Sequence, residues 1–120
     1  MGFIRRATKG GATGLVANPA ALARDELRRA GADLDAPHES RHFFYVPGVK
    51  AAQQFARSLK RPERRIEIET SARKGYWLVA VIQSVVVTPE NMSSLKTEFE
   101  AAAAPFAGEY DCWQVAVADD

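Results

Sequence analysis

Positions 76–87 read Tyr-Trp-Leu-Val-Ala-Val-Ile-Gln-Ser-Val-Val-Val and are nearly all apolar. A strand covered on both faces of a sheet has this composition, so the stretch predicts a central strand. Residues 41–46, Arg-His-Phe-Phe-Tyr-Val, are equally dense in strand formers and predict a second one. Residues 65–69 alternate charge with isoleucine, and residues 110–118 form a further, more polar strand; both are expected at the edges.

Apolar residues recur at helical spacing in residues 49–59 and 89–104, between these strands. The resulting order of strand, helix, strand, strand, helix, strand predicts an α+β, ferredoxin-like βαββαβ sandwich. If the four antiparallel strands are numbered along the chain, their order across the sheet should be 4-1-3-2, with both helices on one face. Trp113 and Val115 are expected to face the helices, and Tyr110 and Cys112 the opposite side.

An extra N-terminal helix is predicted over residues 19–30. Asn18-Pro19 is a cap followed by proline at the first helical position, and Gly31 can end the helix. We expect this helix to pack on the sheet. The face away from the other two helices would carry an apolar patch that needs a cover, made of Phe43, Tyr45, Tyr76, Leu78, Ala80 and Ile82.

At 120 residues the chain has the size of one domain. Residues 1–17, basic and rich in glycine, are expected to be a flexible leader, and residues 18–120 a single domain. The formal net charge of +1 implies no bulk attraction to nucleic acid or acidic lipid. One cysteine allows no internal disulfide and no apolar run reaches membrane-spanning length, so a cytoplasmic protein without membrane association is expected.

Residues 38–42, His-Glu-Ser-Arg-His, fit the H-E-x-x-H pattern of zinc peptidases. That motif requires a helix, which brings the two histidines onto one face one turn apart. Strand formers follow His42 directly and predict an extended chain, in which the two rings lie about 13 Å apart, too far for one zinc ion. We therefore expect no metal site and no peptidase.

Lys74-Gly75-Tyr76 and the stretch Phe44-Tyr45-Val46 resemble parts of the two motifs of RNA-recognition domains, which have this strand order. Tyr45 and Tyr76 would stack on bases, and Lys74, Arg73 and the basic leader would bind phosphate. The match is incomplete, because aromatic residues of the motif are missing at Leu78 and Val81.

A thiol nucleophile at Cys112 is not expected. Asp111 and Cys112 are neighbours on a strand and point to opposite faces, and no feature of the sequence brings a histidine to the thiol. The chain also lacks paired carboxylates with catalytic spacing. We expect no catalytic residue, no cofactor and no enzymatic activity.

Part of the sequence resembles the family called regulator of ribonuclease E activity B (RraB). The resemblance lies in the stretch from Leu27 through Gly31-Ala32-Asp33, in Arg41-His42-Phe43, in the predicted helix over residues 89–104 and in Tyr110-Asp111-Cys112-Trp113. The family usually ends in Tyr-Asp-Gly-Trp, which Tyr110, Asp111 and Trp113 match and Cys112 does not. The family is acidic, and this chain is not.

The resemblance implies a ferredoxin-like, cytoplasmic protein that binds ribonuclease E and restrains messenger RNA decay without catalysis. On this basis the chain is expected to be a non-catalytic, protein-binding regulator with ribonuclease E as its protein partner. The alternative is an RNA-binding domain that uses Tyr45, Lys74 and Tyr76 on the open sheet face. The sequence does not predict an oligomeric state.

Overall fold

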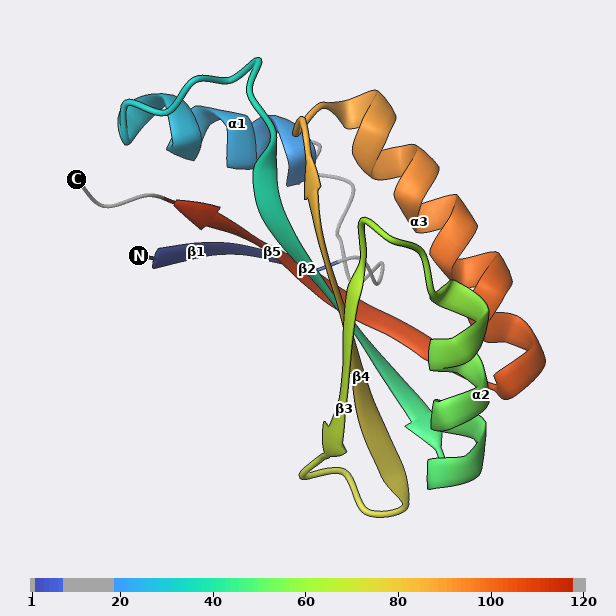
Figure 1. Ribbon diagram of the computed structural model, residues 1–120. Helices are drawn as coiled ribbons and strands as arrows, with labels where there is room; N and C mark the ends of the chain where they lie inside the picture. The colour runs from blue at the N-terminus through green and yellow to red at the C-terminus, as the bar shows by residue number, and fades with distance from the viewer. Residues whose placement is uncertain (1, 8–18, 118–120) are drawn as a thin grey trace.

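The computed structural model describes residues 2–7 and 19–117 (Figure 1). In these residues one sheet is built from strands β1 (Gly2–Ala7), β2 (His38–Pro47), β3 (Arg65–Thr70), β4 (Tyr76–Val85) and β5 (Glu109–Val117). The helices are α1 (Pro19–Arg29), α2 (Val49–Leu59) and α3 (Pro89–Ala103), and a short 3-10 turn, Ala104–Phe106, follows α3. No helix within the described ranges is both long enough and apolar enough to span a bilayer.

Neighbouring strands of the sheet are antiparallel and follow the order β1-β5-β2-β4-β3. The predicted four-stranded antiparallel sheet is thus present as β5-β2-β4-β3, with the two apolar strands inside. The prediction that residues 110–118 form an edge strand is wrong, because β1 pairs with β5 from Gly2 opposite Val117 to Ala7 opposite Cys112. Of the leader predicted over residues 1–17, residues 2–7 form this strand, and residues 1 and 8–17 lie outside the described residues.

Local sequence signals set the helix ends as predicted. α1 begins at Pro19, and Gly31, with φ 81°, adopts the left-handed conformation that ends it. α3 begins at Pro89, and the Thr88 side chain caps it by accepting a hydrogen bond from the Asn91 amide at 3.0 Å. These capping residues fix where each helix meets the sheet.

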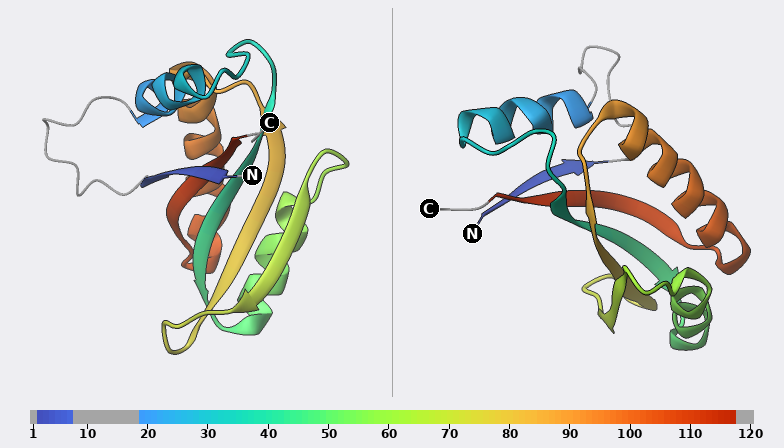
Figure 2. Two further views of the ribbon diagram at one scale, coloured as in Figure 1. Left: turned by 90° about the vertical axis from the view of Figure 1, so that its left-hand side faces the viewer. Right: turned by 45° about the horizontal axis from the view of Figure 1, so that its top comes forward.

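All three helices pack on the same face of the sheet. Ala20, Ala23 and Leu27 of α1 are buried in one core cluster with residues of the other two helices, and the views in Figures 1 and 2 agree. The Arg24 guanidinium joins α1 to the segment between β4 and α3 by donating to the Val87 carbonyl at 2.7 Å. The expectation that this helix covers the opposite face is therefore wrong. Its apolar stripe instead extends the core over β5 and β1.

The opposite face carries the predicted patch, and none of the described residues of α1 lies on it. Phe43, Tyr45 and Leu78 are half-buried and belong to neither the core cluster nor the shell around it. Ala80 and Ile82, on the same face, are each only 4% exposed. We call this surface the open face of the sheet, where these three large side chains and Tyr76, also half-buried, keep partial contact with solvent.

If α1 belongs to the core, its two leucines should differ in their effect on stability. Leu27→Ala is expected to lower the free energy of unfolding by about 2–5 kcal/mol, because it leaves a cavity at a side chain that is 1% exposed. Leu22→Ala, at 36% exposure on the same helix, should change it by less than about 1 kcal/mol. Urea unfolding of the two variants measures the difference, and equal losses would contradict the packing of α1 described here.

Candidate functional site

The family-motif residues Tyr110 and Trp113 lie on the same side of β5, facing the helices. Phe43 pairs with Cys112 and Phe44 with Tyr110, so Asp111 is an extra residue that bulges out of the ladder. In a regular strand two residues three apart point to opposite faces. The bulge places both aromatic rings in the core. The expectation that Tyr110 lies on the same side of the sheet as Cys112 is therefore wrong. No glycine is needed there, because Cys112 does not adopt positive φ.

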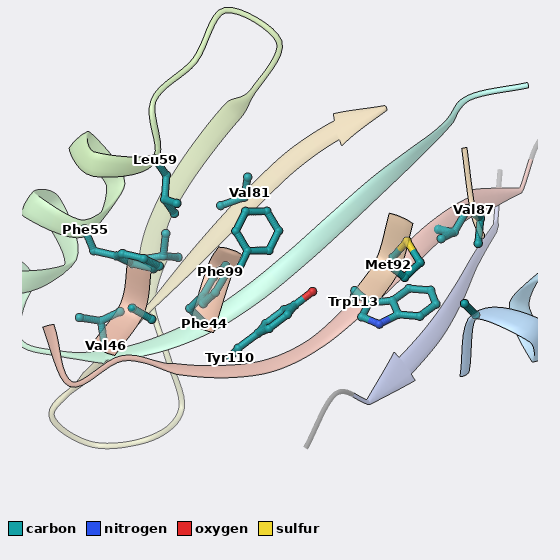
Figure 3. Close-up of a cluster of buried hydrophobic side chains, with 14 of the residues drawn as sticks. Phe44, Val46, Phe55, Leu59, Val81, Val87, Met92, Phe99, Tyr110 and Trp113 are labelled. Carbon is teal, nitrogen blue, oxygen red and sulfur yellow. The ribbon is translucent and has the colours of Figure 1, made fainter. Parts of the chain in front are cut away.

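Both aromatic residues of the motif are buried, at opposite ends of the core (Figure 3). Tyr110, 5% exposed, stacks on Phe44 with a centroid distance of 4.8 Å and meets Phe99 edge-on. Trp113, 4% exposed, lies with Met92 and Val87 near α1. The motif therefore holds β5 against α3 at two places, through Phe99 and through Met92.

A chain of hydrogen bonds runs from Tyr110 through the core to β4. The Tyr110 hydroxyl is 2.5 Å from Nδ1 of His42, and Nε2 of His42 is 2.9 Å from Oγ of Ser40. The Ser40 hydroxyl donates to the Gln83 carbonyl at 2.8 Å. His42 and Ser40 are both 0% exposed. The chain thus links β5, β2 and β4 side by side.

The direction of every hydrogen bond in this chain follows from its last member. A carbonyl oxygen can only accept, so the Ser40 hydroxyl donates to Gln83 and accepts from Nε2–H of His42. Nδ1 of His42 then carries no proton and accepts from the Tyr110 hydroxyl. This assignment takes the imidazole as neutral, the form in which every member of the chain is satisfied; in the charged form Nδ1 would donate to the Tyr110 oxygen instead.

The surroundings of His42 keep it neutral. Burial, and to a smaller extent the nearby Arg64 guanidinium, lower the pKa of His42 from 6.5 to about 3. Burial likewise raises the pKa of Tyr110, with smaller contributions from Cys112 and Glu100. Neither group changes its charge near neutral pH, which suits a structural role better than proton transfer.

Arg64 forms the polar wall of this region, and the sequence does not point to it. Its side chain is only 2% exposed. It donates to the Gln83 side-chain oxygen at 2.6 Å and to Glu98 of α3 at 2.8 Å, and its guanidinium lies 5.1 Å from the Phe99 ring centroid. The sequence does not point to Ser40 either, although its position two residues before His42 in a strand puts both side chains on one face.

The histidines of the H-E-x-x-H pattern lie on a strand, as the extended chain predicts. His38 contacts the Asp33 carbonyl at 2.8 Å, whereas His42 is buried in the core, and Glu39 pairs with Arg41. In the described part of the chain, no three His, Cys, Asp or Glu side chains are grouped to hold a metal ion. The geometry that zinc peptidases need is not formed here.

Tyr45 and Tyr76, proposed for RNA binding, meet around one arginine. The Arg73 guanidinium lies 3.9 Å from the Tyr76 ring centroid and 5.6 Å from that of Tyr45, and it pairs with Glu109 of β5. The hydrogen bond to Glu109 raises the pKa of Arg73. Of the two predicted phosphate ligands, Arg73 is the one that contacts both rings. Lys74 is exposed in the turn before β4.

Removing the Tyr110 hydroxyl should destabilise the fold. Tyr110→Phe leaves Nδ1 of His42 buried without a donor, so the free energy of unfolding should fall by about 1–3 kcal/mol. Tyr45→Phe, on the open face, is the matched control and should change it by less than about 0.5 kcal/mol. Chemical denaturation of both variants is the measurement; an equal effect would show that the hydrogen bond contributes nothing.

The buried histidine should also make stability depend on pH. Its pKa is depressed in the folded state, so the unfolded chain binds the proton more tightly and stability is lost as pH falls from about 6.5 toward 3. One proton contributes a slope of about 1.4 kcal/mol per pH unit within that window. His42→Gln should lose this part of the slope, and His38→Gln should keep it. If all three proteins share one slope between pH 6 and 4, His42 is not neutral in the fold.

The comparison with protein families gives one match, to the model described as RraB, regulator of ribonuclease activity B, over residues 23–115. No curated protein and no solved structure matches the chain significantly. The matched range begins within α1 and ends within β5, so it contains the whole hydrogen-bond chain and both aromatic residues of the motif. With most of its length matched, this chain belongs to the regulator of ribonuclease activity B family.

Proposed function

We propose that the chain is a non-catalytic protein that binds a ribonuclease in the cytoplasm and slows RNA decay by contact. The observation that carries this proposal is the family match over residues 23–115. Ribonuclease E is the partner that we propose. The order of elements from β2 to β5 supports assigning this core to the ferredoxin-like class, with β1 and α1 added to it.

The environment of the reactive groups supports a role without catalysis. Ser40 and His42 form the pair that a hydrolase would use, but both are fully buried. The proton also sits on the wrong nitrogen, because Nε2 of His42 donates to Ser40 and cannot act as its base. Cys112 is 2% exposed. These groups are better suited to holding strands together than to meeting a substrate.

We propose that the family-motif residues support the binding surface from within. Tyr110 and Trp113 are in the core, where a partner cannot contact them directly. Asp111, at the bulge, is half-buried and is the motif residue closest to the surface. On this proposal, changes at Tyr110 or Trp113 weaken binding only as far as they unfold the protein.

The RNA-binding alternative is kept because Tyr45 and Tyr76 do lie around one cation. Two observations favour a protein partner over it. The Arg73 guanidinium already occupies the face of Tyr76 on which a base would stack. Glu109, which holds this guanidinium, and Glu67 and Glu69 of β3 put carboxylates near the path of the phosphates.

The test measures cleavage of an RNA by ribonuclease E from the same genome, at two RNA concentrations a factor of ten apart. If the protein acts on the enzyme, the protein concentration that gives half-maximal inhibition should be the same at both RNA concentrations. If it protects the RNA, the required concentration should rise with the RNA. No inhibition together with no binding to the nuclease would refute the proposal.

A double variant, Tyr45→Ala with Tyr76→Ala, separates the two functions further. It should retain inhibition while its circular dichroism spectrum stays that of the parent. Fluorescence anisotropy with single-stranded RNA should show no salt-sensitive binding by the parent. Such binding, if present in the parent and lost in the double variant, would favour the RNA-binding alternative.

A further inference from the structure

β3 forms the outer edge of the sheet on the side away from β1. It pairs with β4 from Arg65 opposite Ile82 to Thr70 opposite Trp77, and no described residue pairs with its other edge. Backbone amides and carbonyls along that edge are therefore available to another extended chain. Such an edge is the usual site for addition of a peptide strand.

A groove of about 510 Å³ runs beside this edge, between α2 and β3. Its floor is apolar, from Ile66 and Ile68 of β3 and Ala56 of α2. Both isoleucines are half-buried, so they already lie against the core on one side and keep area for a further contact on the other. A strand added to β3 would place every second side chain in this groove.

The rim of the groove is positively charged. Arg57 and Lys60, from α2 and the residue after it, are exposed, and no ion pair with either is found among the described residues. Glu98 of α3 is engaged elsewhere, because it pairs with Arg64 at 2.8 Å and with Arg61 at 3.3 Å. The groove thus combines an apolar floor with two cations that lack a counter-charge.

We propose that the β3 edge and this groove bind an extended segment of a protein partner that is acidic and apolar on one side. The segment adds as a strand to β3, and its groove-facing residues place apolar groups on Ile66 and Ile68 and carboxylates near Arg57 and Lys60. This inference deepens the proposed function by stating which surface receives the partner, and it rests on that function only for the partner's identity.

The opposite side of β3 sets a second requirement on the segment. Glu67 and Glu69 are exposed there, and Arg65 on the same side pairs with Glu67 at 3.5 Å, so the residue of the segment beside Glu69 must not be acidic. The rim cations would attract a phosphate backbone, but RNA has no peptide N–H and C=O groups to complete the β3 edge and no apolar side chains for Ile66 and Ile68. A peptide with different chemistry on its two sides fits the site, and an RNA strand does not.

The first probe is a fluorescent peptide in which threonine alternates with valine or glutamate, so that one side carries valine and glutamate and the other only threonine. The parent protein should bind it with an affinity that falls as salt rises. Arg57→Glu with Lys60→Glu should weaken binding at least tenfold. The matched control, Lys50→Glu with Lys96→Glu, changes the same charge at exposed positions outside the groove and should bind like the parent.

A second pair of peptides tests strand addition itself. Alternate amides of a strand point to opposite edges, so N-methylation of one alternate set should abolish binding and N-methylation of the other should not. Equal binding of both peptides would overturn strand addition. Failure of the parent to bind the unmethylated peptide, or equal binding by the groove variant and its control, would overturn the site.

The nuclease assay keeps this inference distinct from the proposed function. If the parent inhibits ribonuclease E and the groove variant inhibits equally well, the proposed function stands and the groove is excluded. If the parent binds the peptide through the groove but does not affect the nuclease, the groove stands and the proposed function fails. A dimer in sedimentation that the groove variant disrupts would show that a second copy occupies the edge, and would overturn a partner segment there.

Discussion

The hydroxyl of Tyr110 joins a strand near the end of the chain to the middle of the sheet, and the rest of the core is built around that contact. Ser40 donates to the Gln83 carbonyl of β4 and so accepts from Nε2–H of His42, which leaves Nδ1 of the neutral ring to accept from Tyr110. Three neighbouring strands are thereby held in one register by side chains as well as by the backbone ladder. A shift of β5 by one residue would remove Tyr110 from the core and leave His42 without its donor.

This constraint also explains why the motif places tyrosine and tryptophan three residues apart. On a regular strand one of the two rings would lie on the open face. The bulge at Asp111 brings both inside, so that Tyr110 meets α3 through Phe99 and Trp113 lies near α1. A near-neutral chain cannot rely on long-range attraction to find a partner, so any recognition depends on local surfaces such as the rim formed by Arg57 and Lys60.

Much of the fold could be predicted from local patterns. The apolar run of β4, the alternation in β3 and the prolines before α1 and α3 each indicate their element directly. What could not be predicted depends on tertiary pairing. β1 has no apolar alternation of its own and exists as a strand because β5 offers an edge. α1 presents a stripe that fits either face, and only its packing shows which one it covers.

The candidate site was less predictable, because an alternation rule cannot anticipate an inserted residue. Two large aromatic residues at a spacing of three were the available signal for the bulge. His42 was identified as a strand residue, but its burial depends on Tyr110, which lies far away in sequence. Arg64 follows a run of charged residues that reads as solvated surface, and its burial comes from acceptors on β4 and α3.

The position of β5 between β1 and β2 has a consequence for how the protein is made. During synthesis β1 is made before the other described strands and lacks its partner until β5 emerges, because Gly2 pairs with Val117. β2, β3 and β4 can assemble earlier, but His42 on the core side of β2 then lacks the Tyr110 hydroxyl that donates to it. Completion of the fold therefore waits for β5, and contacts this distant in sequence are the slow ones to form. A nascent chain arrested before β5 would leave β1 and one edge of β2 open to mispairing.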